Sequence, residues 1–370
     1  MPTLDELRLQ LNDIDSRLIE LIADRQDTSR EIARVKRATG YPTRDYLRER
    51  EVIIGARDAA VERGVSPRVA EDLMRMLIRS SLATQEQASV AAQAHGTGRQ
   101  ALVIGGAGKL GHWFVDFLGS QGFSVQVSDP AGAPVGATDV GDFRDLKLTH
   151  DFIIVATPLS ATDSILRELA VLRPTGVIFD LGSLKSPLRV GLMALKSAGC
   201  RVTSVHPMFG PDTELLSGRH VIFVDVGHSE ALEKARELFG STMVEQAVMS
   251  LEEHDRLIAY VLGLSHALNI VFFTALTQSG EGAPRLAQLS STTFDAQLDV
   301  ATRVAQESPD LYFEIQSLNE YGAESLQALA SAVETLRNTI LTQDRTGFAK
   351  LMESGREYLE DRRTLHAQRA

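Results

Sequence analysis

Residues 101–111 read ALVIGGAGKLG, a short apolar strand that runs directly into the glycine-rich turn Gly106-Ala107-Gly108-Lys109-Leu110-Gly111. In a turn of this spacing the first glycine allows a tight bend, and the second lets the backbone approach a pyrophosphate. The third permits close packing of the following helix on the strand, and the positive end of that helix faces the phosphates. The stretch predicts a dinucleotide-binding turn, with Gly106, Gly108, Lys109, Leu110 and Gly111 as its cofactor-binding residues.

Asp129 ends the next predicted strand, 23 residues after Gly106. A carboxylate at this place accepts hydrogen bonds from both ribose hydroxyls of a dinucleotide. It also repels a 2′-phosphate, and Pro130 follows it where an arginine would favour that phosphate. The sequence therefore predicts NAD as cofactor rather than NADP, while a solvated turn residue remains the alternative for Asp129.

The pattern around this turn divides the chain into three domains. Short β-branched runs alternate with helical stretches from residue 101 to residue 247, as in 123–129, 151–157, 176–183, 201–207 and 221–226. Such alternation predicts an α/β Rossmann domain with a doubly wound parallel sheet. Helical periodicity alone marks residues 1–90 and 248–370, so we expect an all-α domain on each side and a linker over 91–100.

Three helices are expected in the first domain. Apolar residues recur at three- and four-residue steps from Thr3 to Ala38, and Gly40 and Pro42 follow. A second helix is predicted over 45–63, and a third begins at Ser66-Pro67 and runs to about Gln87.

Two pairs of polar residues interrupt the apolar faces of these helices. Arg25 takes a place where a hydrophobic residue is due, and Lys36, eleven residues later, points within about 20° of it on a helix of 3.6 residues per turn. Ser81 and Gln85 lie one turn apart on one face of the third helix. The pairs indicate polar groups that face inward together.

Composition excludes several classes of partner. The 370 residues carry 38 Lys and Arg against 49 Asp and Glu, a net charge of -11 with no block of like charges. This balance argues against nucleic acid and against an anionic membrane surface as partners. The single cysteine, Cys200, excludes an internal disulfide framework, and the start MPTLDELRLQ lacks the pattern of a secretory signal. We therefore expect a cytoplasmic protein.

The most apolar stretch, Tyr260–Leu276, is short for a membrane span and contains several polar residues. We expect a core or subunit-interface helix there. The histidine and carboxylate residues show no metal-ligand spacing, so no metal is expected.

Two motifs at strand ends, Asp180-Leu181-Gly182-Ser183-Leu184-Lys185 and His206-Pro207-Met208-Phe209-Gly210-Pro211, extend the pattern of the central domain. With them this domain resembles prephenate dehydrogenases, and the first domain resembles the all-helical chorismate mutases. In this order the chain is similar to the bifunctional chorismate mutase/prephenate dehydrogenases of tyrosine biosynthesis. The resemblance implies conversion of chorismate to prephenate, then NAD-dependent oxidative decarboxylation of prephenate to 4-hydroxyphenylpyruvate. It also implies a homodimer and tyrosine as a possible feedback ligand.

The mutase resemblance extends to individual positions. It implies that Lys36 and Gln85 donate to the breaking ether oxygen and are the catalytic residues, and that the substrate is bound by Arg8, Arg25, Asp45, Arg48, Glu49 and Ser81. Arg8 precedes Arg25 by 17 residues, or roughly 25 Å along a helix, too far for both to hold one substrate within one chain. Either Arg8 is a solvated surface residue or it reaches the partner's site in an intertwined dimer.

The dehydrogenase resemblance implies that His206 accepts the proton of the ring hydroxyl and that Ser183 hydrogen-bonds the same hydroxyl. His206 lies where open α/β sheets place ligands, and a neutral imidazole suits a general base. His266 matches a substrate-pocket position associated with tyrosine sensitivity, and a structural core histidine is its alternative.

One position departs from the family pattern. An arginine that binds the ring carboxylate is expected where this chain has Tyr321, and a phenol does not replace a bidentate guanidinium. Arg285, Arg303 or a partner-chain residue can take that role. Alternatively, the dehydrogenase acts on arogenate or an amino-substituted prephenate analogue, or is a non-catalytic dinucleotide-sensing module.

Overall fold

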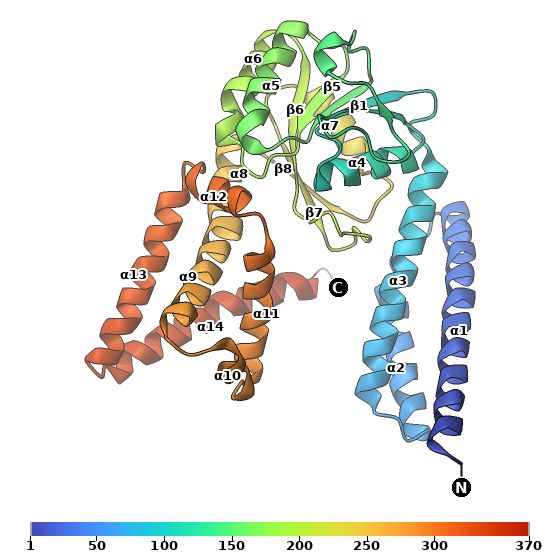
Figure 1. Ribbon diagram of the computed structural model, residues 1–370, viewed down its shortest axis with the longest axis vertical. Helices are drawn as coiled ribbons and strands as arrows, with labels where there is room; N and C mark the ends of the chain where they lie inside the picture. The colour runs from blue at the N-terminus through green and yellow to red at the C-terminus, as the bar shows by residue number, and fades with distance from the viewer. Residues whose placement is uncertain (1, 369–370) are drawn as a thin grey trace. The chain divides into compact units, whose positions relative to one another are not determined.

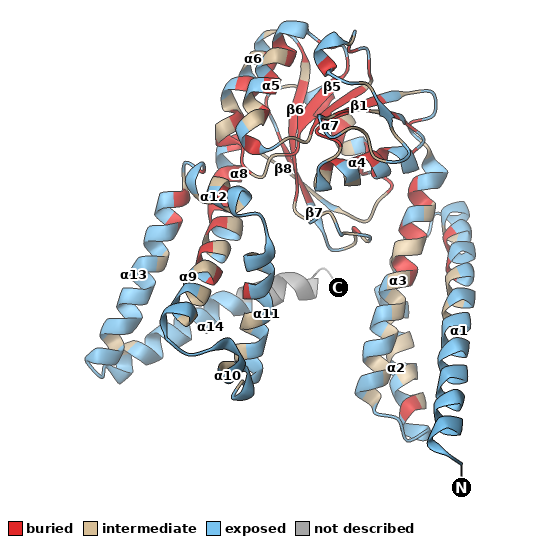
Figure 2. Ribbon diagram, viewed as in Figure 1, coloured by how far each residue is buried: buried red, intermediate tan, exposed pale blue. Residues whose placement is uncertain are grey.

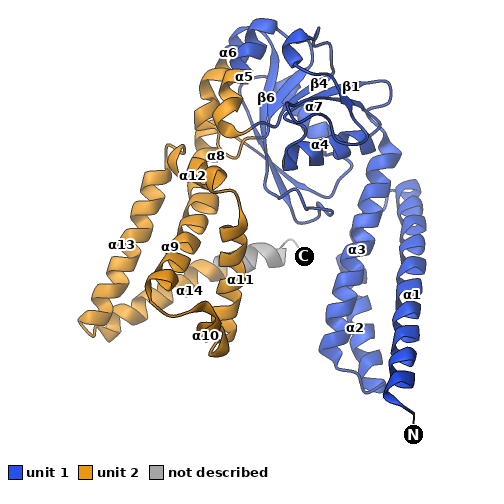
Figure 3. Ribbon diagram, in the orientation of Figure 1, with its two compact units in different colours: residues 1–157, 166–181, 194–248 blue, residues 158–165, 182–193, 249–370 orange. Residues whose placement is uncertain are grey.

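The computed structural model describes the backbone of residues 2–368 and the side chains of residues 2–360. The chain forms two compact units (Figure 3). Unit 1 contains residues 1–157, 166–181 and 194–248, and unit 2 contains residues 158–165, 182–193 and 249–370. The second unit thus takes two short segments of the central domain along with the C-terminal helices.

Unit 1 begins with three long helices, α1 (Leu4–Thr39), α2 (Tyr46–Glu62) and α3 (Pro67–Gln93), and both α1 and α2 pack against α3 (Figure 1). Their ends follow local sequence rules. Thr3 and Glu6 form a reciprocal capping box at the start of α1, Gly40 ends it with φ of 73°, and the Asp45 side chain caps α2. The predicted all-helical first domain is confirmed.

The third helix is longer than the sequence indicated. It continues six residues beyond Gln87 and ends at Gln93. Within the predicted linker, residues 91–93 are therefore helical and only residues 94–99 are irregular. The reason is tertiary: Ser89 and Val90 near the end of α3 are buried, and Val90 belongs to the apolar core of the sheet domain. Packing of this kind extends a helix whose local sequence is small and polar.

An eight-stranded sheet follows, with the order β3-β2-β1-β4-β5-β6-β7-β8. Its strands are β1 (Gln100–Ile104), β2 (Ser124–Ser128), β3 (Thr138–Asp139), β4 (Phe152–Val155), β5 (Val177–Asp180), β6 (Arg201–Pro207), β7 (His220–Val224) and β8 (Glu245–Met249). The strand pairings from β3 through β6 are all parallel, so the predicted α/β class is confirmed.

The sequence-based expectation was wrong at one edge of the sheet. Strand β7 pairs antiparallel with β6, with His206 opposite Ile222. The connection over residues 208–219 contains no helix, and without a crossover element a strand returns antiparallel. The short strands β3 and β8 were not predicted, because two residues, or five half-exposed ones, carry little periodic signal.

The core of this sheet is largely aromatic. Helix α4 (Lys109–Ser120) packs on β1 and β2, and α7 (Ser229–Glu237) packs on β5 and β6. Their side chains meet in a cluster that includes Phe114, Phe117 and Phe239, with ring centroids 5.1 to 6.2 Å apart. The buried strands stand out in Figure 2. Two further helices, α5 (Leu159–Leu172) and α6 (Arg189–Ser197), and the 3₁₀ turns 143–145 and 186–188, complete the connections.

Unit 2 is otherwise helical, as predicted. Its helices are α8 (Leu251–Ile258), α9 (Ser265–Gln278), α10 (Ala283–Gln288), α11 (Thr292–Gln306), α12 (Pro309–Ser317), α13 (Gly322–Leu341) and α14 (Arg345–Gln368). A π-helical turn, Ala259–Leu264, joins α8 to α9 without a break. By length and composition alone, the resulting helix Leu251–Gln278 could cross a membrane, and core helices of soluble proteins pass the same test.

Candidate active sites

A cavity of about 310 Å³ lies among the three N-terminal helices. Seven of the eight residues that the mutase resemblance implied line it: Arg25, Lys36, Asp45, Arg48, Glu49, Ser81 and Gln85. Apolar side chains such as Ile32, Val52 and Leu82 complete the wall. The helices therefore bring one polar set, drawn from distant parts of the sequence, onto a single concave surface.

Arg25 is held in place at the floor of this cavity. Its guanidinium donates to the Leu77 carbonyl at 2.6 Å and to the hydroxyl of Ser81. The Ser29 hydroxyl, in turn, donates to Ser81 at 2.9 Å. Burial lowers the pKa of Arg25, which nonetheless stays charged near neutrality. The arrangement fixes a cation whose remaining N–H groups are available to an anion.

The Lys36 ammonium, on α1, and the Gln85 side-chain amide, on α3, both line the cavity. The Lys36 ammonium donates to the Thr43 carbonyl at 2.6 Å, which uses one of its three protons. Gln85 is 7% exposed, and its buried Oε1 finds no hydrogen-bond partner within the described part of the chain. A buried polar atom without a partner is costly, so a bound ligand at this point would be stabilised by Gln85.

The remaining polar groups form the rim. Asp45 accepts from the backbone N–H of Arg48 at 3.0 Å, so it caps α2 and lines the cavity at once. The Arg48 side chain pairs with Glu51 at 3.0 Å. The Glu49 carboxylate accepts hydrogen bonds from Nε and Nη2 of Arg44, at 2.9 and 3.1 Å. The sequence had not suggested this bidentate pair.

Arg8 does not reach this cavity. It pairs with Asp5 at 3.4 Å, and its side chain is 67% exposed on α1. The structure thus agrees with the distance estimate from the sequence, and both alternatives for Arg8 stay open within a single chain.

The glycine-rich turn has the close packing that its sequence predicted. A Cβ on Gly111 would lie 2.1 Å from the carbonyl oxygen of Gly105, and one on Gly106 would lie 2.8 Å from Val127. At Gly108 the nearest atom would be 3.4 Å away, so its surface is open to a ligand. Gly108 caps α4, whose first residues are Lys109 and Leu110, and whose N–H groups face outward there.

Asp129 lies directly beside this turn, at the end of β2. Its Oδ2 accepts from the backbone N–H of Ala107 at 3.1 Å, and its Oδ1 accepts from that of Ala131 at 2.9 Å. The carboxylate is therefore oriented by backbone groups on both sides of the turn. The glycines, the helix start and this carboxylate are the groups that fit a dinucleotide with an unphosphorylated ribose.

His206 lies near the C-terminal end of β6 and is 4% exposed. It is a residue of unit 1, together with the glycine turn and Asp129. Ser183, His266 and Tyr321 belong to unit 2. The proposed dehydrogenase residues are thus divided between the two units.

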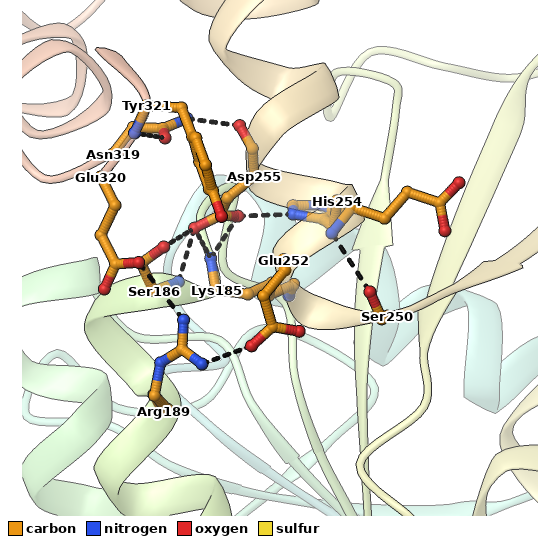
Figure 4. A network of polar contacts seen from close by, with 11 residues as sticks. Lys185, Ser186, Arg189, Ser250, Glu252, His254, Asp255, Asn319, Glu320 and Tyr321 are labelled. Atoms are coloured by element: carbon orange, nitrogen blue, oxygen red, sulfur yellow. Dashed lines mark hydrogen bonds and ion pairs between the residues drawn. The ribbon is translucent and has the colours of Figure 1, made fainter. Parts of the chain in front are cut away.

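A buried carboxylate organises the part of unit 2 around Ser183 (Figure 4). Asp255 is fully buried and accepts from the backbone N–H groups of Lys185 and Ser186, from the Ser186 hydroxyl, and from Nδ1 of His254 at 2.6 Å. Burial would raise the pKa of Asp255, but the hydrogen bonds from His254 and Ser186 outweigh it and lower the pKa. This network fixes the segment that immediately follows Ser183.

Tyr321 is joined to the same network. Asn319 donates to the backbone carbonyl of Asp255 at 2.9 Å and accepts from the backbone N–H of Tyr321 at 2.9 Å. The neighbouring Glu320 pairs with Arg189 at 3.3 Å, and Arg189 also pairs with Glu252 at 2.5 Å (Figure 4). Arg189 is a cation near Tyr321 that the sequence analysis missed.

The two cations that the sequence analysis named lie elsewhere on unit 2. Arg285 pairs with Glu281 at 3.3 Å with its side chain 73% exposed, and Arg303 is exposed on α11. The short motif after β5 gave no signal for Arg189, because its partners are 63 and 131 residues away.

His266 is half-buried in α9 and stacks on Tyr312, with ring centroids 4.1 Å apart. Burial lowers the pKa of His266, so its ring is neutral near pH 7. Its Nδ1 has no hydrogen-bond partner in the described part of the structure. The ring is thus packed with one buried nitrogen unpaired, and both the substrate-pocket role and the structural alternative for His266 stay predictions.

Comparisons with known proteins match all three domains. Residues 7–86 match the family model of chorismate mutase type II. Residues 127–247 and 250–354 match the nucleotide-binding domain and the dimerization domain of prephenate dehydrogenase. The chain belongs to the bifunctional chorismate mutase/prephenate dehydrogenases. The resemblance inferred from the sequence motifs is therefore confirmed.

Relatives and solved structures agree with this family. The T-protein of Haemophilus influenzae is 24% identical over 98% of this bifunctional enzyme and 93% of its own length, and that of Enterobacter agglomerans is 27% identical over 84% and 81%. A prephenate dehydrogenase from A. aeolicus, solved with hydroxyphenyl propionate and NAD+, superposes with a TM-score of 0.55 at 20% identity. The superposition covers 70% of this chain and 98% of that one, and it shows a shared fold.

The expected absence of a metal stays a prediction. Among residues 2–360, no group of three or more His, Cys, Asp or Glu side chains is placed to hold a metal ion. The domain boundaries at residues 90, 100 and 247 likewise stay predictions.

Proposed function

We propose that the two reactions of this bifunctional enzyme take place at two separate sets of residues. Chorismate is rearranged to prephenate in the cavity between α1, α2 and α3, and prephenate is oxidised and decarboxylated to 4-hydroxyphenylpyruvate by the other two domains. The observation that carries the mutase assignment is the gathering of seven polar residues on one 310 Å³ cavity, which suits a compact dicarboxylate.

The mutase needs no nucleophile, because the rearrangement is pericyclic. What it needs is a site that holds the reactive conformer and stabilises charge on the breaking ether oxygen. Arg25, Arg48 and the neighbouring apolar wall bind and orient the substrate. Lys36 and Gln85 donate to the ether oxygen, Lys36 through its ammonium and Gln85 through its side-chain N–H groups.

Asp45, Glu49 and Ser81 orient the ring hydroxyl and the arginines in this proposal. Ser81 already accepts from Arg25, and Asp45 is held by the start of α2. Their fixed positions reduce the reorganisation needed at the moment of reaction.

In the dehydrogenase, His206 accepts the proton of the ring C4 hydroxyl and Ser183 hydrogen-bonds that hydroxyl. Loss of carbon dioxide then yields the aromatic product. The cofactor is NAD, and when bound it supplies the hydride acceptor. Gly106, Gly108, Lys109, Leu110 and Gly111 hold its pyrophosphate, and Asp129 holds its ribose.

We assign the ring-carboxylate cation to Arg189. It lies beside Tyr321 and its carboxylate neighbours Glu252 and Glu320, and two of its five donors are used by them. The other N–H groups remain for the substrate. In this assignment the Tyr321 side chain packs against the substrate or donates through its hydroxyl, and Arg189 supplies the positive charge.

The residues around Arg189 also support a second candidate substrate, one that carries an amino group. Two carboxylates, Glu252 and Glu320, face a single Arg189, so the corner carries one excess negative charge. Such a charge favours an amino-bearing substrate. A relative of 28% identity over 68% of this chain and 88% of its own length is named 4-amino-4-deoxyprephenate dehydrogenase, from Streptomyces pristinaespiralis. NADH formation with prephenate, arogenate and the amino analogue side by side decides between them.

A homodimer is part of this proposal. The apolar stripe of α1 remains open: Leu4, Leu11, Leu18 and Leu21 are 64, 59, 47 and 63% exposed. A second copy would cover this stripe and bring its Arg8 to the cavity of this chain. In the dimerization domain, Val261 in the π-helical turn and Val271 in α9 are also about half exposed.

Tyrosine as a feedback ligand and a cytoplasmic location complete the proposal. In this proposal tyrosine acts at or near the active sites, with His266 as the residue to test. Lys36→Ala tests the mutase site. The variant should lose chorismate consumption while NADH formation from supplied prephenate stays at the wild-type rate. Retained mutase activity would refute the placement of the site.

A further inference from the structure

The C-terminal half of α3 carries an unusual charge. Glu86 is next to Gln85 in the chain, is 4% exposed and lies in unit 1. Its two oxygens accept from the backbone N–H of Leu216 at 2.7 Å and from that of Met243 at 2.5 Å. Burial raises the pKa of Glu86, although these amide donors oppose the shift. A buried carboxylate is costly, and its donors come entirely from the nucleotide-binding domain.

The segment over residues 208–219, which joins β6 to β7, makes a second tie to the mutase helices. Ser217 accepts from Nη1 of Arg44 at 2.8 Å. The other N–H groups of this guanidinium hold both oxygens of Glu49, which lines the mutase cavity. Ser217 is therefore linked to the cavity residue Glu49 through Arg44.

The segment is itself firmly placed. Leu216 is 4% exposed in the apolar core of the sheet domain. Trp113 on α4 donates through its indole N–H to the carbonyl of Thr213 at 3.0 Å, and its ring packs on Phe209 with centroids 4.9 Å apart. A segment anchored in this way transmits its position to whatever it holds.

We propose that residues 208–219 of the nucleotide-binding domain are a positioning element of the mutase site: Leu216 fixes Glu86 and thereby Gln85, and Ser217 fixes Arg44 and thereby Glu49. The mutase of this chain is thus completed by a domain that lies outside the mutase sequence. This inference rests on the proposed placement of the mutase site in the cavity.

Ser217→Ala in the full-length enzyme is the main test. Removing the hydroxyl releases one donor of Arg44, so Glu49 is held less well and chorismate binds more weakly. We expect the KM for chorismate to rise about threefold to tenfold, with kcat changed less than twofold, because the lost hydrogen bond acts on the substrate only through Arg44 and Glu49. Ser217→Thr keeps the hydroxyl and should restore the wild-type KM. Ser229→Ala, at an exposed position at the start of α7, is the matched control.

Glu86→Gln tests the other tie. A glutamine has one acceptor oxygen and turns an amide N–H toward the second backbone donor, so the turn that carries Gln85 shifts. Since Gln85 is proposed to act on the breaking bond, we expect mutase kcat to fall about fivefold or more with little change in KM. Glu62→Gln, an exposed position on α2, is its control. NADH formation from prephenate in each preparation measures the folded fraction.

The outcomes separate the possibilities. A wild-type KM for Ser217→Ala, or a KM that Ser217→Thr fails to restore, overturns the inference. So does a loss of mutase and dehydrogenase rates in equal proportion, since that is the mark of unfolding. If Lys36→Ala in the same series keeps its mutase activity, the site placement itself has failed. If Lys36→Ala is inactive and Ser217→Ala is normal, only the positioning role is wrong.

Discussion

Asp255 provides the sharpest stability prediction for unit 2. Its carboxylate is fully buried and is the common acceptor for four donors: the backbone N–H groups of Lys185 and Ser186, the Ser186 hydroxyl and Nδ1 of His254. Asp255→Asn keeps the shape but replaces one acceptor oxygen by an amide that donates. About two of the four donors then lose their acceptor.

The cost follows from the burial of these groups. A buried donor without an acceptor costs about 1 to 3 kcal/mol, so two of them give a loss of about 2 to 6 kcal/mol in the free energy of unfolding. For a body of this size we expect the thermal midpoint of unit 2 to fall by about 10 °C or more. Because the network holds the segment after Ser183, dehydrogenase activity should be lost with it.

Residual activity after brief heating is a suitable assay, since the proposed mutase residues lie in unit 1 alone, whereas the dehydrogenase also needs residues of unit 2. Samples of wild type and Asp255→Asn are heated over a series of temperatures, cooled, and assayed for chorismate consumption and for NADH formation from prephenate. Only the NADH-forming midpoint should fall, because the mutase residues lie in unit 1. Glu253→Gln, at the exposed residue two positions earlier, is the control and should match wild type.

The same carboxylate predicts a pH dependence of definite sign. The pKa of Asp255 is lowered in the folded protein, so its contribution is fully present above the usual carboxyl pKa and is lost as the pH falls through the lowered value. The stability difference between wild type and Asp255→Asn should therefore shrink on acidification. An Asp255→Asn midpoint within 2 °C of wild type at pH 7 would refute the reasoning that this network is buried and satisfied.

Three further changes test the dehydrogenase. Gly111→Ala places a Cβ 2.1 Å from the Gly105 carbonyl oxygen, so α4 must move, and the Kd for NAD by calorimetry should rise at least about tenfold with mutase activity unchanged. His206→Asn should lower the dehydrogenase kcat by about 10²-fold to 10⁴-fold while NAD binding is kept; an unchanged rate would exclude His206 as the base. Arg189→Gln should raise the KM for prephenate about tenfold with only a small change in thermal midpoint, because its ion pairs are partly exposed; a normal KM would return the role to another cation.

The gathering of the proposed mutase residues on one cavity was predictable from the sequence because these residues follow helical spacing. Arg25 and Lys36 share a face of α1, and Ser81 and Gln85 share a face of α3, so periodicity and resemblance pointed to the same positions. The glycine turn was predictable for a similar reason, since each glycine answers a local packing demand. Arg8 was correctly excluded from the cavity of its own chain by distance along one helix.

What the sequence could not supply depends on tertiary contacts. The end of α3 was placed too early because its small, polar residues are helical only where Val90 packs in the sheet core. The antiparallel direction of β7 was missed because a strand has the same residue pattern in either direction, and only the missing crossover helix distinguishes them.

The same limit applies to charge. Asp255 lies beside two other carboxylates, Glu252 and Glu253, which are exposed, whereas Glu86 has no other Asp or Glu within ten residues on either side. What distinguishes the buried pair is that each accepts backbone N–H groups from a segment far along the chain: Lys185 and Ser186 for Asp255, Leu216 and Met243 for Glu86. Backbone donors have no side-chain identity, so no residue type in the sequence marks them. Asp255 holds the segment that follows Ser183, and Glu86 directly follows Gln85 in the chain. Each buried carboxylate is therefore tied to backbone close to a proposed active-site residue. A charge buried in this way is costly unless its donors are fixed. Substitution of Asp255 or Glu86 therefore tests whether distant backbone groups position the proposed catalytic residues of this enzyme.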